Sequence, residues 1–236
     1  MNDLSVILCS YNEEKNIEKT IKKLLKYRVV KEIIIIDDYS KDKTISIINS
    51  FRDKRIKLRV RKKIRGFASA FIYGISLSKG KYILRFDVDM HQSIDLFINV
   101  FLKLYKSKKE LVIFSRYIKK GKDLRGDFRK LSSLILNKIC QIVISDKVKD
   151  YTSCIFFFRK DILKDVNINN TGYANFIIEF VSEAIIKNKS IIEVPFKQLK
   201  ATEKNSKSAK NMIIYIKNGF LYILSILKSY HIKLKY

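Results

Sequence analysis

Residues 4–14 read LSVILCSYNEE, a short apolar run that passes directly into polar residues. The run 4–9 has the length and the Leu, Val and Ile content of a buried strand. Beyond the polar residues, Ile17, Ile21 and Leu24 recur at the spacing of one face of a helix. A strand followed by an amphipathic helix predicts the first unit of a parallel sheet whose strands are joined by helices.

The same alternation continues through the first half of the chain. Two more periodic stretches, 45–51 and 68–75, predict helices, and further apolar runs predict strands at 32–36, 56–60, 82–86 and 111–114. We therefore expect an α/β fold with a doubly wound, mostly parallel sheet. Asn12 and Asp42 are predicted helix N-caps, and Gly80 is predicted to end the third helix.

The pattern changes after residue 114. It predicts, in order, a helix at 129–144, a strand at 155–158, a helix at 176–187 and a strand at 191–196. Residues 200–210 are polar, and an apolar, aromatic segment flanked by lysines follows them. We expect a domain of residues 1–210 and a C-terminal amphipathic helical segment of residues 211–236.

The composition limits the class of protein. The 236 residues are 47% hydrophobic, which suits one compact domain with at most a short appendage. Lys and Arg number 49 against 23 Asp and Glu, a net charge of +26 that attracts polyanions. Nucleic acid, anionic lipid headgroups and phosphorylated substrates all fit this charge, so the charge alone does not choose among them.

Targeting and cysteine patterns are unremarkable. Cys9, Cys140 and Cys154 form no C-x-x-C pair and lie in apolar runs, which disfavours a disulfide framework or a zinc site. The first ten residues lack the features of a signal peptide, and no run of about 18 uncharged apolar residues occurs. We expect a cytosolic chain that does not span a bilayer.

Acidic side chains follow several predicted strands, where open α/β sheets bind ligands. Asp87 and Asp89 alternate after the fourth strand, with His91 next to them. In so basic a chain such a cluster is costly unless it holds a cation or hydrogen-bonds a ligand, and Mg²⁺ or Mn²⁺ suits these side chains. A D-x-D triplet by itself is a weak motif and favours the other interpretation, loop carboxylates that cap the following helix.

Other nucleotide-binding and catalytic motifs are missing from the sequence. Neither G-x-G-x-x-G after the first strand nor G-x-x-x-x-G-K-[ST] occurs, which argues against a dinucleotide enzyme and a P-loop NTPase. His91 and His231 are the two histidines, so acid–base catalysis by histidine has few candidates.

Four stretches in order resemble the blocks of family 2 glycosyltransferases, namely 4–13, 34–44 (IIIDDYSKDKT), 65–70 (RGFASA) and 87–89 (DVD). Residues 115–117, 128–131, 150–153, 159–161 and 193–196 are similar to blocks of the dolichyl-phosphate mannose synthase group. The resemblance covers about residues 4–207. It implies a GT-A fold, transfer with inversion, and a lipid-phosphate acceptor such as polyprenyl or dolichyl phosphate.

The same resemblance implies roles for individual residues. Those that would contact the nucleotide-sugar donor are Cys9, Tyr11, Glu13, Ile36, Asp38 and Val88. Asp87, Asp89 and His91 would hold the metal, with Asp89 the first choice for direct ligation. Arg116 and Arg129 would meet the acceptor phosphate, Ser153 would lie at the substrate, and Lys207 would lie near the donor diphosphate.

Some positions depart from the family pattern. Cys9 stands where proline is usual, His91-Gln92 reverses the usual order, and Ala174 and Ala201 replace expected basic residues. Overall likeness to the mannose synthases favours GDP-mannose over UDP-glucose as donor. The alternatives are a glycosyltransferase that uses a UDP-sugar or a sugar hydroxyl acceptor, and a basic nucleic-acid-binding protein.

The C-terminal segment shows helical periodicity, with apolar residues at 212, 213, 216, 220, 223, 224 and 227. Lysines and tyrosines flank them, as at the surface of an anionic membrane. A helix folded against the rest of the protein has the same periodicity. Because a lipid acceptor keeps its tail in the bilayer, we expect this segment to bind the cytosolic face of a membrane.

Overall fold

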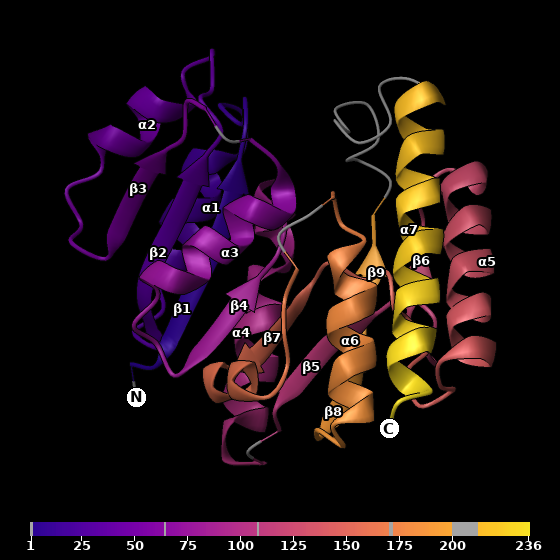
Figure 1. Ribbon diagram of the computed structural model, residues 1–236. Coiled ribbons are helices and arrows are strands. Elements are labelled where there is room, and N and C mark those ends of the chain that lie inside the picture. Colours follow the sequence, from indigo (N-terminus) through magenta and orange to yellow (C-terminus); the bar gives the residue numbers. More distant parts are fainter. Residues whose placement is uncertain (1, 64, 108, 170–171, 200–211) are drawn as a thin grey trace. The chain divides into compact units, whose positions relative to one another are not determined.

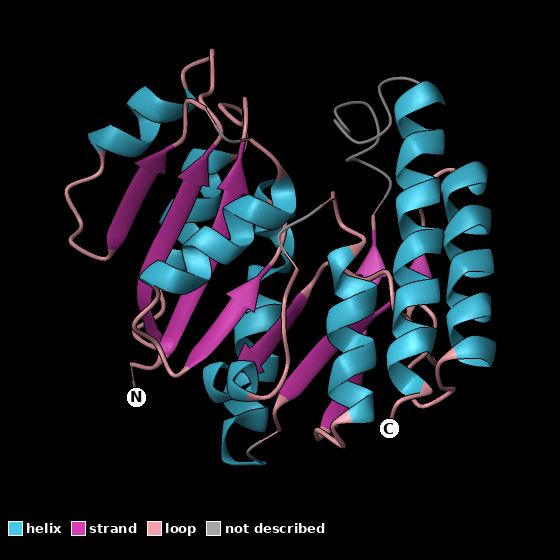
Figure 2. Ribbon diagram, viewed as in Figure 1, coloured by secondary structure: helices cyan, strands magenta, loops and turns pink. Residues whose placement is uncertain are grey.

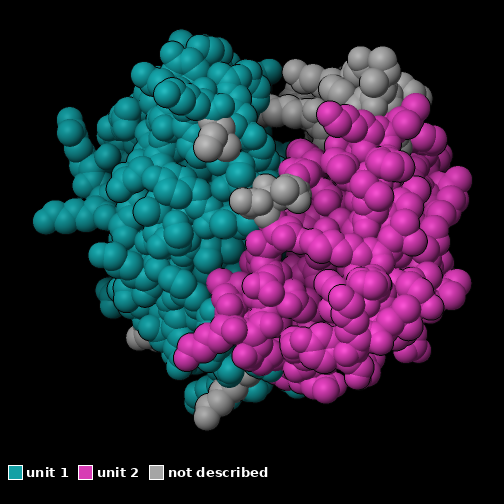
Figure 3. Space-filling view, in the orientation of Figure 1, with its two compact units in different colours: residues 1–110, 155–161 teal, residues 111–154, 162–236 magenta. Residues whose placement is uncertain are grey.

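The computed structural model describes residues 2–63, 65–107, 109–169, 172–199 and 212–236, with side chains in the last range from residue 216 onward. The chain forms two compact units, residues 1–110 with 155–161 and residues 111–154 with 162–236 (Figure 3). The C-terminal helix belongs to the second unit. The expected division into 1–210 and 211–236 stays a prediction.

The first unit is built on five strands in the order β3-β2-β1-β4-β7 (Figure 1). They are β1 (Leu4–Ser10), β2 (Val30–Asp37), β3 (Ile56–Val60), β4 (Tyr82–Arg85) and β7 (Phe156–Arg159). The first four are parallel, and β7 pairs with β4 in the antiparallel direction. The apolar runs therefore predicted the strands to within two residues. They did not predict that β7, from much later in the chain, joins this sheet.

Helices cover the sheet of the first unit. They are α1 (Ile17–Leu25), α2 (Thr44–Ser50), α3 (Phe67–Leu77) and α4 (Ile94–Leu104), with 3-10 turns η1 (Val88–Ser93) and η2 (Tyr105–Ser107). In Figure 2 α3 crosses the near face of the strands. Gly74 allows that close approach, because a Cβ there would lie 2.5 Å from Ile7 Cγ2. The predicted α/β architecture is confirmed.

Two of the predicted caps need correction. The helix α1 begins at Ile17 with Asn16 at the cap position, and Asn12 instead adopts φ 52° and accepts a 2.8 Å hydrogen bond from the Lys41 amide. Gly80 lies beyond the end of α3, and a Cβ there would meet Ser5 Oγ at 2.5 Å, so close packing requires the glycine. Asp42 does cap α2, from one position outside it, by accepting a 3.0 Å bond from the Thr44 amide.

The described residues of the second unit form two parallel strand pairs and three α-helices. The strand β5 (Leu111–Ser115) pairs with β8 (Ile191–Pro195), and β6 (Lys122–Asp123) pairs with β9 (Lys197–Gln198). The helices are α5 (Asp127–Val143), α6 (Phe176–Ile186) and α7 (Met212–Lys233), and η3 (Lys160–Lys164) is the turn at which the chain passes between units. Three predicted elements of this half thus correspond to α5, α6 and β8.

The C-terminal helix α7 packs against α6 and α5 (Figure 1). Its contact face contains the buried Ser225, Ile226 and Ser229. Ser225 Oγ donates to Glu179 Oε1 at 2.7 Å and accepts from Asn175 Nδ2 at 2.9 Å. The apolar residues of the predicted face that are described, Ile216, Phe220, Ile223, Leu224 and Leu227, are all exposed. Of the helices in the described ranges, none is both long and apolar enough to be a membrane span.

Candidate active site

The loops that follow β1 and β2 are joined by the fully buried Asp37. Its Oδ2 accepts hydrogen bonds of 2.6 Å from Ser10 Oγ and from Ser40 Oγ, and its Oδ1 accepts one of 2.7 Å from the Ser40 amide. Ser40 Oγ in turn accepts from the Asn12 amide at 2.9 Å. Because β1 and β2 are parallel neighbours, their carboxyl ends meet here, and Asp37 fixes both loops together.

Asp38, a predicted nucleotide contact, is tied to the loop before α3. Arg61 Nε donates to Asp38 Oδ1 at 2.8 Å, and the Gly66 amide donates to Asp38 Oδ2 at 2.8 Å. Arg61 also donates to the Gly66 carbonyl at 3.0 Å. Gly66 has φ 134°, a conformation that side-chain-bearing residues rarely adopt. These bonds hold the Asp38 carboxylate at the sheet edge in one orientation.

The remaining predicted donor contacts in the first unit differ in what they expose. Ile36 and Val88 are buried, so neither side chain is open to a ligand. Tyr11 is half-buried, and its ring centroid lies 6.0 Å from the Arg65 guanidinium carbon. Burial raises the pKa of the Cys9 thiol to about 12, so the thiol stays neutral at physiological pH.

Asp89 carries an enclosed oxygen, Oδ1, that has no hydrogen-bond partner among the residues that the structure describes. Burial, followed by the negative charges of Asp87 and Glu13, raises the pKa of Asp89 to about 7. Three carboxylates are thus brought together by the loops after β1 and β4, although they lie far apart in sequence. A bound cation would relieve their repulsion and supply the partner that Oδ1 lacks.

His91, in the same 3-10 turn as Asp89, also has an enclosed atom without a partner in the described part of the chain, Nδ1. Burial and the charges of Lys19 and Lys23 lower the pKa of His91, which favours the neutral imidazole that binds metals. The described residues contain no ready-made cluster of three or more His, Cys, Asp or Glu side chains around a metal position. The two unsatisfied acceptors nevertheless fit a hard or borderline divalent cation.

The turn η1 that carries Asp89 and His91 is attached to α1. Thr20 Oγ1 donates to the Val88 carbonyl at 2.6 Å, and Thr20 is fully buried. Lys23 Nζ lies 2.8 Å from Asp95 Oδ2, at the start of α4. The candidate ligands therefore rest on a turn that two helices hold in place.

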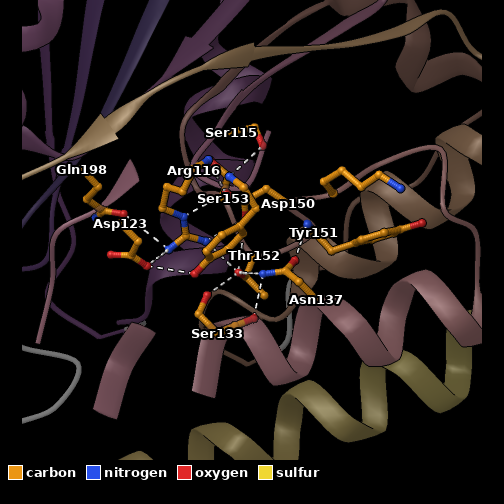
Figure 4. Close-up of polar contacts among 12 residues, drawn as sticks. Ser115, Arg116, Asp123, Ser133, Asn137, Asp150, Tyr151, Thr152, Ser153 and Gln198 are labelled. Carbon is orange, nitrogen blue, oxygen red and sulfur yellow. Dashed lines mark hydrogen bonds and ion pairs between the residues drawn. The ribbon is translucent and has the colours of Figure 1, made fainter. Parts of the chain in front are cut away.

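In the second unit, Arg116 is the centre of a buried polar network (Figure 4). Its Nε and Nη2 donate to the two oxygens of Asp150 at 2.8 and 2.7 Å, and Nη2 also donates to Thr152 Oγ1 at 2.7 Å. Its Nη1 lies 3.4 Å from Gln198 Oε1 and 3.6 Å from Asp123 Oδ2. The guanidinium group is therefore engaged on all sides by the protein itself.

The network continues to α5. Asn137 Nδ2 donates to Thr152 Oγ1 at 2.9 Å, and Asn137 Oδ1 accepts from the Tyr151 amide at 2.6 Å (Figure 4). Ser133 Oγ lies 2.9 Å from Thr152 Oγ1. Ser153, a predicted substrate contact, is buried and donates to the Phe114 carbonyl at 2.7 Å. These bonds fix α5 to the strand-end loops of its unit.

Arg129 differs from Arg116 in its surroundings. It lies in the first turn of α5, is half-buried, and makes no ion pair with any residue in the described ranges. Its charge is available to an anion, whereas that of Arg116 is already neutralised by Asp150. The structure thus separates two arginines to which the sequence pattern assigned one role. Lys207 lies outside the described residues.

Several residues of the site were not singled out from the sequence. Asp37, Arg61 and Asp150 hold the loops, and Arg85 donates to Asp87 Oδ1 from the end of β4. Asp37 and Asp150 stood in motif blocks, which was a usable signal. Arg61 and Arg85 are single basic residues in a chain with 49 of them, so nothing in the sequence distinguished them.

Comparisons with known proteins agree on the family and the fold. A model of Glycosyl transferase family 2 matches residues 5–166. Dolichol-phosphate mannosyltransferase of Pyrococcus furiosus is 31% identical over 206 residues, which is 82% of this chain and 55% of that protein. The chain therefore spans about half the length of this relative. An uncharacterized protein of Methanocaldococcus jannaschii is 33% identical over 187 residues, 71% of this chain and 76% of that protein.

Solved structures give the fold. The structure of glucosyl-3-phosphoglycerate synthase from Mycobacterium tuberculosis in complex with UDP is similar, with a TM-score of 0.73 and 16% sequence identity. The match covers 98% of this chain and 80% of the synthase chain. The same enzyme with Mn²⁺, UDP and phosphoglyceric acid matches 97% and 78% with a TM-score of 0.72 and 15% identity. The expected GT-A fold is confirmed. The family match and the Pyrococcus furiosus relative support the expectation of a glycosyltransferase. The chain belongs to glycosyl transferase family 2.

Proposed function

We propose that this enzyme transfers a hexose, mannose by preference, from GDP-mannose to a polyprenyl or dolichyl phosphate at the cytosolic face of a membrane, with inversion and with Mg²⁺ or Mn²⁺. The Pyrococcus furiosus relative, a dolichol-phosphate mannosyltransferase, supports this choice of substrates. The Mycobacterium tuberculosis enzyme binds Mn²⁺ and UDP, which supports a metal-dependent nucleotide-sugar donor. The observation that carries the lipid acceptor is the surface of α5.

One side of α5 is apolar and exposed along its whole length. The side chains concerned follow one another at steps of three and four residues, and they are Phe128, Leu131, Ile135, Ile139 and Ile142, with exposed fractions from 38 to 82%. Such a stripe normally faces a protein core. This one begins next to Arg129, which makes no ion pair with any residue in the described ranges. A phosphate held by Arg129 would have a polyprenyl tail with apolar surface beside it.

The neighbouring helix α7 also carries exposed apolar side chains. Its exposed Phe220, Ile223, Leu224 and Leu227 lie on the helix that packs beside α5, where Lys233 Nζ donates to the Val143 carbonyl at 3.2 Å. Exposed lysines accompany both helices, at positions 130, 138, 217 and 228. Apolar side chains with lysines around them are typical of helices that lie in an anionic membrane surface. Nucleic acid, the non-enzyme alternative, has no aliphatic chains that would cover the exposed isoleucines and leucines.

The chemistry of a phosphate acceptor fits the residues of the site. A phosphate monoester is already an anion near neutral pH, since its second pKa is about 6, so its attack on the anomeric carbon needs no general base. The charge of Arg129 would orient the attacking oxygen. When bound, a divalent cation neutralises charge on the departing nucleoside diphosphate. A sugar hydroxyl acceptor would instead require a carboxylate base, which makes direct glycan assembly the second candidate.

The proposal predicts donor selectivity in a thermal-shift experiment. With Mn²⁺ present, GDP-mannose at a hundredfold excess over its Kd is expected to raise the Tm by about 5 °C or more, because ligand binding at that excess contributes about 2.7 kcal/mol. UDP-glucose under the same conditions is expected to give a smaller shift. Stabilisation by UDP-sugars without any by GDP-sugars would overturn the donor assignment in favour of the UDP-sugar alternative.

The proposal also predicts that the exposed stripe binds membranes. The double variant Ile135→Ser, Ile142→Ser is expected to reduce co-sedimentation with vesicles that contain phosphatidylglycerol by at least about tenfold, because each buried aliphatic side chain contributes about 1.5–3 kcal/mol. Stability should change little, since both side chains are exposed in the free protein. Activity on a long-chain lipid phosphate should fall, and donor binding should not.

A matched control is Leu102→Ser, which removes an apolar side chain of 44% exposure from α4 in the other unit. This variant should bind vesicles like the wild type. Point substitutions are a cleaner test than deletion of α7, because Ser225, Ile226 and Ser229 of that helix are buried against the rest of its unit and a deletion would expose their partners. Unchanged vesicle binding in the Ile135, Ile142 variant, or a change of oligomeric state instead, would show that the stripe has another partner.

A further inference from the structure

Arg85, the last residue of β4, is a buried arginine in an otherwise apolar strand. Its side chain is only 4% exposed, while that of Asp87, two residues further on, is 45% exposed. Arg85 Nη2 donates to Asp87 Oδ1 in a charge-assisted hydrogen bond. A guanidinium group at the end of a central strand is therefore directed at one of the candidate metal ligands.

The surroundings of Arg85 restrict its movement. The guanidinium carbon lies 4.2 Å from the centroid of the Phe67 ring, at the first residue of α3. The backbone of Arg85 is in register with Ile7 of β1 and with Phe156 of β7, so both sides of its strand are paired. Stacking of an arginine on an aromatic ring holds the planar group in one orientation. Arg85 can thus fix the direction of the Asp87 carboxylate.

Burial of a charge at this position is costly unless a partner compensates it. Tyr82, Ile83 and Leu84, the rest of β4, are buried and offer no negative charge. The compensation comes from the acidic side of the site, where Asp87 accepts the hydrogen bond and Asp89 lies near enough for its pKa to be affected by Arg85. The arginine and the carboxylates therefore depend on each other.

We propose that Arg85 is a positioning residue for the metal site: it holds Asp87 through Oδ1 and leaves Oδ2 directed outward to a divalent cation. This inference rests on the metal-dependent transfer proposed above. Hydrogen bonds to the non-ligating atoms of metal ligands orient those ligands, and their removal typically weakens metal affinity 10–100-fold. The charge of Arg85 repels a cation, and its ion pair with Asp87 reduces that repulsion.

The test measures Mn²⁺ binding directly, by electron paramagnetic resonance of free Mn²⁺ titrated into the full chain with GDP present. Arg85→Met is expected to raise the Kd for Mn²⁺ about tenfold or more. Arg85→Lys, which restores one charged donor without the fork, should give an intermediate Kd. Removal of a buried charge partner can impair folding, so Phe67→Leu serves as a second variant. It is expected to raise the Kd for Mn²⁺ about threefold and to leave the circular dichroism spectrum unchanged.

The matched control is Arg159→Met. Arg159 Nε donates to Asp161 Oδ1 at 2.6 Å, an arginine–aspartate pair with the same spacing in sequence, next to Tyr82 at the opposite end of β4. Its Mn²⁺ affinity should equal that of the wild type. Unchanged or tighter Mn²⁺ binding in both Arg85→Met and Phe67→Leu would overturn the inference. If the wild type itself bound no Mn²⁺, the proposed metal-dependent function would fail instead.

Discussion

Asp89→Asn is expected to reduce transfer activity by roughly a thousandfold and, in the same protein, to raise the stability of the metal-free form at pH 8. The first effect follows because an amide keeps the shape of the side chain but loses the charge that binds the cation. The bound cation stabilises the transition state by several kcal/mol, and about 1.4 kcal/mol corresponds to a tenfold change in rate. The second follows from the unfavourable environment of the free carboxylate, enclosed beside Asp87 and Glu13.

The sign of the pH dependence is fixed by the direction of the shift. The pKa of Asp89 is raised in the folded state, to about 7 from an ordinary value of 3.8, so its contribution to stability is fully present below pH 3.8 and is lost as pH rises through 7. The asparagine side chain does not ionise, so that variant loses no stability as the pH rises. Its Tm in EDTA should therefore exceed that of the wild type by more than about 2 °C at pH 8 and should match it near pH 4.

The control for this experiment is Asp165→Asn. Asp165 lies in the other unit in an exposed pair with Lys189 and has a lowered pKa, so this variant should keep full activity and show no gain in stability at pH 8. Near-normal turnover of Asp89→Asn would contradict the metal assignment. A Tm of the metal-free variant that is lower than that of the wild type at pH 8 would show that the carboxylate is not under strain.

Arg116→Ala is expected to lose folding stability, whereas Arg129→Ala is expected to keep it. Arg116→Ala leaves Asp150 buried without its bidentate partner, and breaking a buried ion pair from one side costs about 3–5 kcal/mol. Denaturant unfolding should show this loss. Arg129→Ala should unfold like the wild type to within about 0.5 kcal/mol, because the side chain is half-buried and makes no ion pair with a described residue.

The kinetic results for the two arginines should differ as well. Arg129→Ala is expected to raise the KM for the lipid phosphate about tenfold or more, since a charge-assisted hydrogen bond contributes about 1.5–3 kcal/mol, while the donor KM stays unchanged. Lys54→Ala, which removes an exposed lysine from the first unit, is the control and should leave both KM values unchanged. A stable Arg116→Ala protein with a raised acceptor KM would restore Arg116 to the phosphate-binding role that the sequence resemblance implies.

The amino-acid pattern was sufficient for most of the first unit. Runs of Ile, Val and Leu give β1, β2 and β4, because a strand buried on both faces can carry few polar residues. The alternating residues of β3 give a half-buried strand. The polar residues that follow β1 and β4 in sequence lie at the same edge of the sheet, as the pattern predicted, since parallel neighbouring strands end on the same side. Helix starts were less predictable: Asn12 has the composition of a cap but serves as an acceptor in a loop, because residues from another loop compete for its side chain.

Partners distant in the sequence were decided only by the tertiary structure. Arg116 resembles a phosphate-binding residue in sequence, but folding places it between Asp150, Thr152 and Asp123. Arg85 is one basic residue among many until β4 brings it to Asp87. A charge in a one-dimensional sequence has no burial and no neighbours, and these two properties determine whether it is free to bind a ligand.

The helix α7 shows the same limit for apolar residues. Its sequence determined a helix and an apolar face, and both are present in the structure. The sequence did not determine which face packs: Ser225, Ile226 and Ser229 are buried against the protein, with Ser225 bonded to Glu179 and Asn175. The described apolar side chains of the predicted face are exposed instead. Periodicity records only that one side of a helix differs from the other, whereas the choice of the buried side depends on the hydrogen-bonding partners that α6 presents.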